Sequence, residues 1–216
     1  MREVFVTDSA AARFSALLTG VDTPVHRMTD RAAKTLSDTV SPVGLVAVCG
    51  AFAVSLSEVV DAVPRLVVIA VDLSEPGNAG TLIRLSHAMG ADAVVLAGHS
   101  VDPYNAKCLR ASAGSAFAVP VVVESDAGEA IRVLTQAGLK VLAATPDGEV
   151  PLDSADLSQP TTWMFGSEAH GLAAAIAASA DARVRIPMPG GAESLNVAAA
   201  AAICLYQSAQ AQRSPT

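Results

Sequence analysis

Aromatic residues, cysteine pairs and long apolar runs are all scarce in this chain of 216 residues. Aromatic residues make up 4% of it and hydrophobic residues 51%, so the core must be aliphatic, as in a buried parallel sheet covered by helices. The longest apolar run, Val197 to Tyr206, is too short and too rich in alanine to span a bilayer. No basic and apolar leader opens the chain, so we expect a cytoplasmic protein that does not enter a membrane.

The cysteines and histidines offer no grouped metal ligands. Cys49, Cys108 and Cys204 lie far apart, without a CxxC motif or a neighbouring histidine. This spacing disfavours both a disulfide framework and a zinc site, and it is typical of small buried hydrophobic residues. The four histidines are equally dispersed, so we expect no bound metal.

Positive charge is also in short supply. The formal net charge is −7, which argues mildly against a nucleic-acid partner because phosphate binding needs local positive charge. The charge is uneven, however. Residues 1–55 carry five Lys or Arg against five acids, whereas residues 116–216 carry five against ten. A basic patch in the front half is therefore compatible with the acidic total.

The first 55 residues form a small α/β fragment. Strand patterns at 2–7, 25–28 and 45–52 are separated by helical patterns, but the fragment is too small for a good core of its own. A polar stretch (SLSEVVDAVPR) that contains Pro64 follows it. We therefore expect a partial N-terminal domain, a linker and a main domain at 1–55, 56–65 and 66–213.

The main domain alternates strands with helices. We assign its strands to residues 66–71, 92–97, 119–123, 139–145, 161–165 and 182–188. Such alternation predicts a parallel sheet with helices on both faces. Ligands bind beyond the carboxyl ends of the strands in these sheets, so the loops that follow the strands hold the candidate site.

The first of these loops is Ser74–Arg84 (SEPGNAGTLIR), between a strand and a helix. Its glycines are spaced GxxG, which fits neither a dinucleotide fingerprint nor a P-loop. Two interpretations stay open: a tight turn with Asn78 as the helix cap, and a phosphate cradle built from backbone N–H groups. Arg84, in the first turns of a helix expected over 81–89, faces the positive end of the helix dipole, which indicates an anionic neighbour.

Two further loops come from the last quarter of the chain. In FGSEAHGL (165–172), Glu168 fits helix capping or a role with Arg84 or a ligand, and we expect His170 to face solvent. In IPMPGGAESLN (186–196), prolines and glycines make an irregular loop, and Ser194 or Asn196 begins the last helix. These loops follow consecutive strands, which predicts that they form the floor of one pocket.

The three loops together resemble the motifs of the SpoU–TrmH family, RNA 2′-O-ribose methyltransferases of the SPOUT superfamily. N-x-G-T-x-x-R at Asn78–Arg84, then FGSEAHGL, then IPMPGGAESLNVAAAAA match the family in order and spacing over about residues 66–210. Ser167 and His170 stand where the family often has Asn and a small or polar residue. This departure bears on substrate preference more than on the reaction.

The resemblance implies a fold and a cofactor. The fold is an α/β parallel sheet flanked by helices, with a C-terminal segment threaded into a deep trefoil knot, in a homodimer. The knot binds S-adenosyl-L-methionine, and the matching positions are Ala144, Thr145, Phe165, Gly166, Glu168, Ile186, Met188, Ser194, Leu195 and Asn196.

The implied reaction is an in-line displacement, in which a ribose 2′-oxygen takes the sulfonium methyl group without a metal or a covalent intermediate. In the family, the residue that matches Arg84 is assigned to the hydroxyl. A guanidinium does not readily give up a proton, so we expect Arg84 to clamp the RNA phosphate and hydroxyl. The residues expected to orient Arg84 and the ribose, or to support them, are Glu168, Asn196, Asn78 and Ser194.

The N-terminal fragment favours ribosomal RNA as the substrate. It resembles the second half of a small RNA-binding domain that precedes the knot in many rRNA-directed members. The alternatives are a non-catalytic RNA-binding member of the same fold, a tRNA 2′-O-methyltransferase and a generic nucleotide- or phosphate-binding α/β enzyme. The joint presence of Asn78, Arg84, Glu168 and Asn196 favours catalysis, and the generic enzyme leaves the C-terminal loops unexplained.

Overall fold

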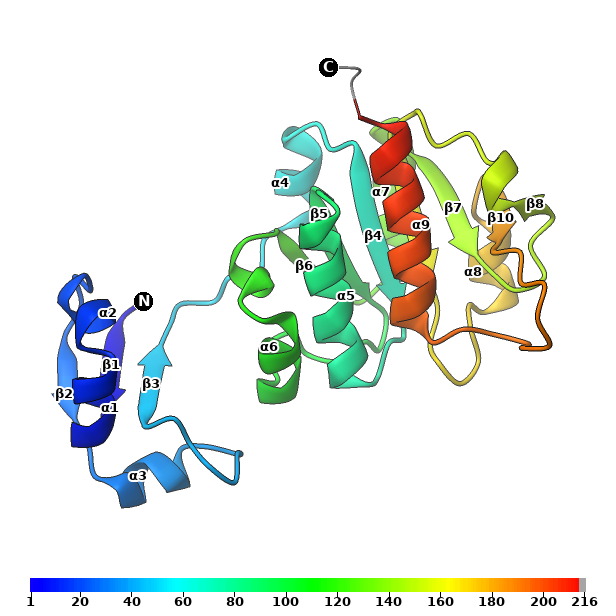
Figure 1. Cartoon of the computed structure of the whole chain (residues 1–216). Helices are drawn as coiled ribbons and strands as arrows, with labels where there is room; N and C mark the ends of the chain where they lie inside the picture. The colour runs from blue at the N-terminus through cyan, green and yellow to red at the C-terminus, as the bar shows by residue number, and fades with distance from the viewer. Residues whose placement is uncertain (214–216) are drawn as a thin grey trace. The chain divides into compact units, whose positions relative to one another are not determined.

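The computed structural model describes residues 1–213 and divides into two compact units, with the boundary in the chain between Ala51 and Phe52 (Figure 1). The division lies a few residues before the expected boundary at residue 55. Each unit has its own sheet.

The first unit has a three-stranded sheet in the order β2-β1-β3. Strand β1 (Glu3–Val6) pairs in parallel with β2 (Val25–Arg27) and antiparallel with β3 (Leu45–Val48). Three short helices accompany the sheet: α1 (Asp8–Arg13), α2 (Ser15–Thr19) and α3 (Asp30–Thr35). Its buried apolar side chains are few and small: Val4, Val6, Ala10 and Ala33. This small core agrees with the expectation from the sequence.

The second unit has a seven-stranded sheet in the order β6-β5-β4-β9-β7-β10-β8. All of its strand pairs are parallel, which confirms the predicted sheet. The strands are β4 (Leu66–Val71), β5 (Ala93–Ala97), β6 (Val121–Glu124), β7 (Lys140–Ala144), β8 (Val150–Pro151), β9 (Thr161–Phe165) and β10 (Ala182–Arg185).

Helices cover both faces of this sheet (Figure 1). One face carries α5 (Pro76–Ala88), α6 (Ala106–Ser112) and α9 (Val197–Ala211), and the other carries α4 (Leu56–Asp61), α7 (Ala127–Gln136) and α8 (Ala174–Ala178). Each face of the sheet has its own hydrophobic core under its helices. Because side chains alternate along a strand, Trp163 and Phe165 lie in the core under α5, α6 and α9, and Met164 lies in the core under α4, α7 and α8. Within residues 1–213, no helix has both the length and the apolar character that a membrane crossing requires.

The stretch expected as a linker contains helix α4. Ser55 Oγ accepts a hydrogen bond from the Glu58 N–H (3.3 Å), and Glu58 Oε2 accepts one from the Ser55 N–H (2.8 Å), which forms a capping box. Leu56 and Val59 are buried in the same core as Met164 of β9, so residues 56–61 pack on the sheet of the second unit. Two apolar residues three positions apart suffice for this short amphipathic helix, although the stretch is polar on average.

Two helices begin elsewhere than predicted. Helix α5 begins at Pro76, not Thr81, and Glu75 rather than Asn78 caps it by accepting the Gly77 N–H (3.0 Å). Arg84 therefore lies in the third turn, where the dipole argument no longer applies. The pair Asp102–Pro103 predicts a second helix start with Asp102 as the cap, but α6 begins at Ala106 and is capped by Asn105. The Asp102 carboxylate instead accepts the N–H of Tyr104 (2.9 Å).

The strand order brings three loop-bearing strands together. Strand β9 lies between β4 and β7, and β10 lies between β7 and β8. The loop after β7 packs tightly on β10, because a Cβ at Gly148 would lie 2.6 Å from the carbonyl carbon of Val184. Only glycine fits at that approach. The carboxyl ends of β9, β7 and β10 are thus neighbours, and the loops that leave them meet.

Candidate active site

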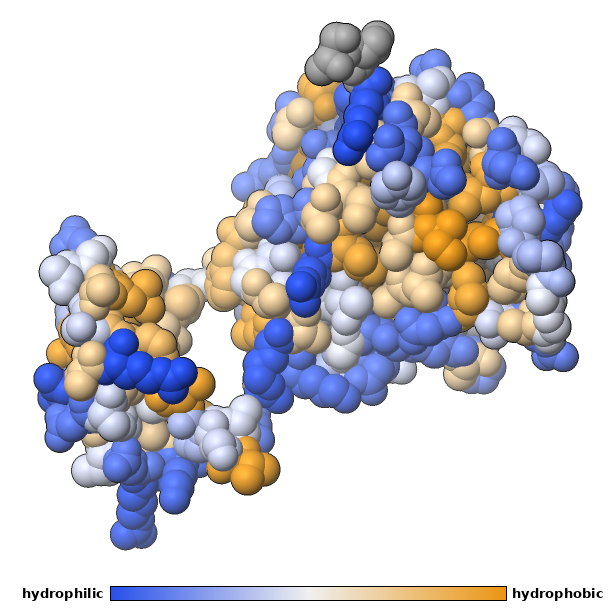
Figure 2. Space-filling view, in the orientation of Figure 1, coloured by the Kyte–Doolittle hydropathy of each residue, from blue (hydrophilic) through white to orange (hydrophobic). Residues whose placement is uncertain are grey.

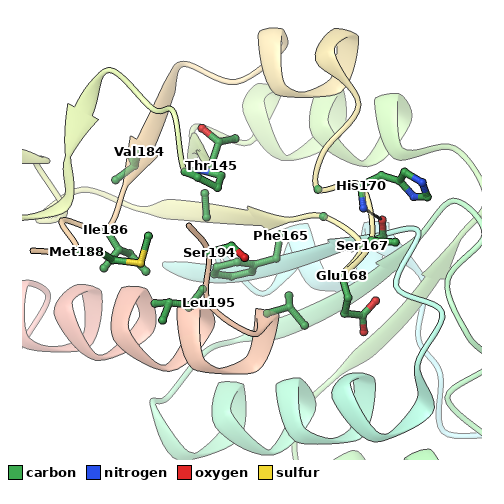
Figure 3. Close-up of a pocket in the computed structure, with 17 residues that line it drawn as sticks. Thr145, Phe165, Ser167, Glu168, His170, Val184, Ile186, Met188, Ser194 and Leu195 are labelled. Atoms are coloured by element: carbon green, nitrogen blue, oxygen red, sulfur yellow. Dashed lines mark hydrogen bonds between the residues drawn. The ribbon is translucent and has the colours of Figure 1, made fainter. Parts of the chain in front are cut away.

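A cavity of about 330 Å³ lies beyond the carboxyl ends of β7, β9 and β10 (Figure 3). All of the predicted cofactor residues line it except Asn196. Volumes of this size are typical of small-molecule sites. The cavity therefore stands at the edge of the sheet where parallel α/β proteins bind their ligands.

The cavity has an apolar wall and a few polar groups. Phe165, Ile186, Met188 and Leu195 contribute apolar surface, and Figure 3 shows Ile186 and Met188 gathered at one end. Thr145 also lines the cavity, and its Oγ1 is buried without a hydrogen-bond partner among the described residues. A buried hydroxyl usually has a partner. This orphan oxygen fits a polar atom of a bound ligand.

A tight turn, Ser167–Gly171, forms the opposite end of the cavity. The Gly171 N–H donates to the Ser167 carbonyl (2.9 Å), and the His170 N–H donates to Ser167 Oγ (3.3 Å). A Cβ at Gly166 would overlap the backbone of Gly171, so the chain can fold back only with glycine there. Helix α8 begins at Ala174, so Glu168 lies in this turn and not at a helix N-terminus as the capping interpretation required.

A chain of hydrogen bonds joins the three sequence motifs at this end. Asn78 Nδ2 donates to Glu168 Oε1 (2.6 Å), and Asn196 Nδ2 donates to Asn78 Oδ1 (3.3 Å). Asn196 Oδ1 in turn caps α9 by accepting the N–H groups of Ala198 (2.9 Å) and Ala199 (3.4 Å). Asn196, rather than Ser194, thus begins the last helix. The Glu168 carboxylate is thus held directly by the amide of Asn78, which is itself held by Asn196 at the start of α9.

Arg84 is not part of this chain. Its side chain is exposed on α5, and it makes no hydrogen bond or ion pair among residues 1–213. The cation that does pair near the start of α5 is Lys107, which donates to Glu75 (2.7 Å) and lowers the pKa of that carboxyl. The structure brings together Asn78, Glu168 and Asn196, but it leaves Arg84 outside the cavity.

Sequence reasoning gave His170 no role beyond exposure to solvent. The side chain is exposed, as expected, but it also lines the cavity two residues after Glu168. A signal was present in the sequence. Glycines at 166 and 171 predict a tight turn. A tight turn holds Glu168 and His170 close together, at the same end of the cavity.

These features define a class of protein: an open parallel α/β enzyme with a small-molecule cavity at the carboxyl edge of its sheet. The chain belongs to the SpoU rRNA Methylase family, whose model matches residues 65–206. This assignment confirms the resemblance of the three motifs.

Two relatives illustrate the similarity. The chain is 33% identical over 206 residues to the 23S rRNA (guanosine(2553)-2'-O)-methyltransferase RlmP of Bacillus subtilis, covering 95% of this chain and 79% of the relative. It is 37% identical over 139 residues to the 23S rRNA (uridine(2479)-2'-O)-methyltransferase of Streptomyces viridochromogenes, covering 62% of this chain but only 48% of that relative.

Solved structures extend the likeness to both units. The SpoU methyltransferase AviRb of S. viridochromogenes in complex with AdoMet matches with a TM-score of 0.86 at 29% identity, covering 97% of this chain and 82% of its own. An AdoMet-bound rRNA methyltransferase of Sinorhizobium meliloti matches at 0.84 and 28%, covering 99% and 81%. A structure concerned with 2-OH methylation of C/U34 on tRNA matches at 0.58 and 25%, covering 68% and 95%.

Proposed function

We propose that the protein is an S-adenosyl-L-methionine-dependent RNA 2′-O-ribose methyltransferase that acts on ribosomal RNA. The observation that carries this proposal is the hydrogen-bonded chain Glu168–Asn78–Asn196 at the mouth of a cofactor-sized cavity. Membership of the SpoU family supports the reaction, and the two relatives described above are named as 23S rRNA 2'-O-methyltransferases.

The cavity fits the cofactor by its chemistry. Its apolar wall suits an aromatic base, and the orphan Thr145 hydroxyl suits a polar group of the ligand. The residues that would hold it are the cavity-lining ones at Ala144, Thr145, Phe165, Gly166, Glu168, Ile186, Met188, Ser194 and Leu195, together with Asn196, which follows the lining residue Leu195 in the chain. When bound, S-adenosylmethionine supplies an electrophilic methyl group.

The residues of the chain then position the ribose. Asn78 holds the Glu168 carboxylate and is itself held by Asn196, and the carboxylate can accept a further hydrogen bond from a ribose hydroxyl. The guanidinium of Arg84 has no lone pair available to accept a proton, so its part is to clamp the RNA phosphate and hydroxyl. Positioning of this kind can supply a large part of the rate acceleration of a displacement reaction.

A homodimer would place Arg84 in the site. Helix α9 exposes an apolar stripe on its outer side, at Ala199, Ile203 and Tyr206, and Figure 2 shows apolar side chains gathered around and beside α9. Apolar stripes at this spacing suit helix–helix contact. In this proposal, Arg84 of one copy serves the cavity of the other, because it has no partner within its own described chain.

The trefoil knot and the cytoplasmic location complete the proposal. The insertion of β10 between β7 and β8, with the loop after β7 packed on it at Gly148, is compatible with a threaded C-terminal segment.

Ribosomal RNA is favoured over transfer RNA by the matched structures. The rRNA methyltransferase of S. meliloti covers 99% of this chain, whereas the tRNA-related structure covers 68%.

The direct test is transfer of tritium from labelled S-adenosylmethionine to total ribosomal RNA from a strain that lacks the enzyme, with transfer RNA as the control. The methylated positions are then mapped as 2′-O-methyl sites. The cofactor alone should raise the melting temperature through its binding to the folded state. No shift at millimolar cofactor and no transfer would contradict the proposal, and a shift without transfer would favour a non-catalytic member.

Subunit mixing tests the shared site. Arg84→Ala and Glu168→Gln should each be inactive alone. If each site uses Arg84 from one copy and Glu168 from the other, an exchanged equal mixture regains about a quarter of wild-type activity, because half of the dimers are mixed and each has one intact site. A mixture that stays inactive after verified exchange would contradict the shared site.

A further inference from the structure

We infer that His170 is a further catalytic residue, the group at the mouth of the cavity that takes up the proton of the ribose 2′-hydroxyl. This role rests on the proposed function, because it concerns the same site. Methyl transfer to a hydroxyl must release a proton, and the guanidinium of Arg84 has no lone pair available to accept one. The proton therefore needs another acceptor close to the ribose.

The candidates are the groups that line the cavity. Glu168 and His170 are its two ionisable side chains among the described residues. Both belong to the turn Ser167–Gly171 and are separated by one residue, Ala169. Figure 3 shows the imidazole of His170 and the carboxylate of Glu168 at the same end of the cavity, directed away from Ile186 and Met188 at the other end.

The polarity of the cavity assigns this end to the RNA. Apolar side chains at Phe165, Ile186 and Met188 form the inner part, which suits the cofactor. The ribose is polar and comes from outside, so it meets the polar end first. His170 is exposed there, which suits a side chain that faces an incoming polynucleotide.

The existing hydrogen bonds separate the roles of the two side chains. Glu168 Oε1 already accepts a short bond from Asn78 (2.6 Å), which fixes the carboxylate as an orienting group. The ring of His170 makes no hydrogen bond or ion pair within residues 1–213, while its backbone N–H is held by Ser167 Oγ (3.3 Å). The imidazole is thus anchored by its main chain, and its nitrogens are open to a substrate.

The chemistry of the side chains points the same way. Imidazoles as a class exchange protons near neutral pH, whereas carboxylates bind protons only in acid and serine or threonine hydroxyls are very weak bases. The ribose 2′-oxygen forms a bond to the methyl carbon, and the carbon–sulfur bond breaks with its electron pair remaining on sulfur. The hydroxyl proton passes to a ring nitrogen of His170, and the resulting imidazolium returns it to water.

The first experiment compares His170→Gln with wild type in single-turnover transfer to total ribosomal RNA from a strain that lacks the enzyme. Glutamine keeps a polar side chain but cannot take the proton, so the rate should fall at least about 100-fold. RNA affinity, measured by filter binding without cofactor, should stay within about threefold, because the loss falls on the chemical step. His99→Gln is the matched control, since the structure gives that exposed side chain no bond and uses only its backbone N–H.

The second experiment follows the rate with pH. In wild type the rate should rise about tenfold per pH unit below the titration range of imidazole, and this rise should vanish in His170→Gln. Glu168 is the other ionisable group in the turn. The charged groups nearby are Glu75 at the N-cap of α5, Arg84 on α5 and Glu193 in the loop 186–196. Because these groups remain in the variant, a loss of the slope belongs to His170. Added imidazole should restore activity to His170→Ala.

Two outcomes would overturn the role. In the first, the wild-type protein transfers methyl groups, and His170→Gln has an unimpaired rate or an unchanged pH profile. This result excludes His170 from the reaction and leaves the proposed function standing. No transfer by the wild-type chain removes both. The rise in melting temperature with cofactor, measured on each variant, shows that the cavity is intact.

Discussion

Asn78 and Glu168 lie 90 residues apart in the sequence, and a 2.6 Å hydrogen bond joins them at the mouth of the cavity. The sheet explains the meeting. Strands β4 and β9 are paired up to Ala70 and Phe165, so the segments that leave their carboxyl ends start side by side. The half-buried amide of Asn78 then bridges the carboxylate and Asn196.

Replacement of Asn78 should impair methyl transfer while sparing the cofactor. Asn78→Asp keeps the shape but sets a second carboxylate against Glu168, so the carboxylate should leave its place. We expect transfer to fall about 100-fold, with the cofactor-induced rise in melting temperature preserved. Asn105→Asp is the matched control, because aspartate is an equally good helix cap and Asn105 lies outside the cavity. Equal activities of the two variants would contradict the role of Asn78.

Replacement of Arg84 should remove activity without loss of stability. The side chain is exposed and makes no hydrogen bond or ion pair in the part of the chain that the structure describes. Arg84→Ala should therefore change the free energy of unfolding by less than about 0.5 kcal/mol, while transfer falls by orders of magnitude. Arg84→Lys should recover little, since an ammonium cannot form the bidentate contact. Unchanged turnover in Arg84→Ala would exclude the residue from the reaction.

Gly166 tests the turn that carries Glu168 and His170. A methyl group at this position would overlap the backbone of Gly171, so Gly166→Ala should destabilise the fold by about 1–3 kcal/mol and abolish the cofactor-induced rise in melting temperature. Gly190→Ala serves as the control, because a Cβ there meets no atom within 4 Å. Thermal unfolding with and without cofactor measures both effects. A Gly166→Ala protein with normal stability and cofactor response would contradict the tight turn.

The sheet was predictable from the sequence to a large extent. The bounds of β4 and β9 match the expected strands, because both are short, mostly apolar runs that are buried on both faces. Helix starts were less predictable. Pro76 and Asn78 both carry a start signal, and only the packed structure selects the first. Strand β8 has two residues and leaves no periodic pattern to detect.

The site was predictable as a set of residues and not as a set of contacts. Family motifs named Asn78, Glu168 and Asn196, but their hydrogen bonds require a particular strand order that periodicity does not encode. Arg84 is exposed because Leu82 and Ile83 on the same helix face the core, whereas its distance from the helix start was not predictable because the capping signals were ambiguous. A lone loop histidine carries no signal of its own, so His170 can be placed beside the cavity only through the glycines at 166 and 171 that flank it.

A buried hydrogen bond holds α9 to the sheet. The indole N–H of Trp163 donates to Ser208 Oγ (2.8 Å), and both residues are fully buried. Ser208→Ala leaves the indole N–H without a partner, so it should lower the free energy of unfolding by about 1–3 kcal/mol. Urea unfolding followed by the fluorescence of this single tryptophan measures the change. Ser154→Ala, on the surface, should change it by less than about 0.5 kcal/mol.

The cysteines should differ in reactivity. Burial raises the pKa of Cys108 to about 11, with a contribution from Asp102, and that of Cys204 to about 12, whereas Cys49 is exposed. A thiol reagent at pH 8 should label one thiol per folded chain and three after denaturation. A folded-state pKa above the unfolded one gives stability that is complete below the ordinary thiol pKa, about 8.5, and is lost as pH rises toward 11–12. Rapid labelling of all three thiols in the folded protein would contradict this burial.

The position of β9 in the middle of the sheet also affects how the protein can be made. During synthesis, β4, β5 and β6 leave the ribosome well before β9, so β4 presents an open edge to other nascent chains until Thr161–Phe165 has emerged. Premature termination within residues 125–160 would leave that edge permanently unsealed, and such fragments should aggregate or be degraded. An enzyme of ribosomal RNA would then depend on the ribosome finishing almost the whole polypeptide before any methylating capacity exists.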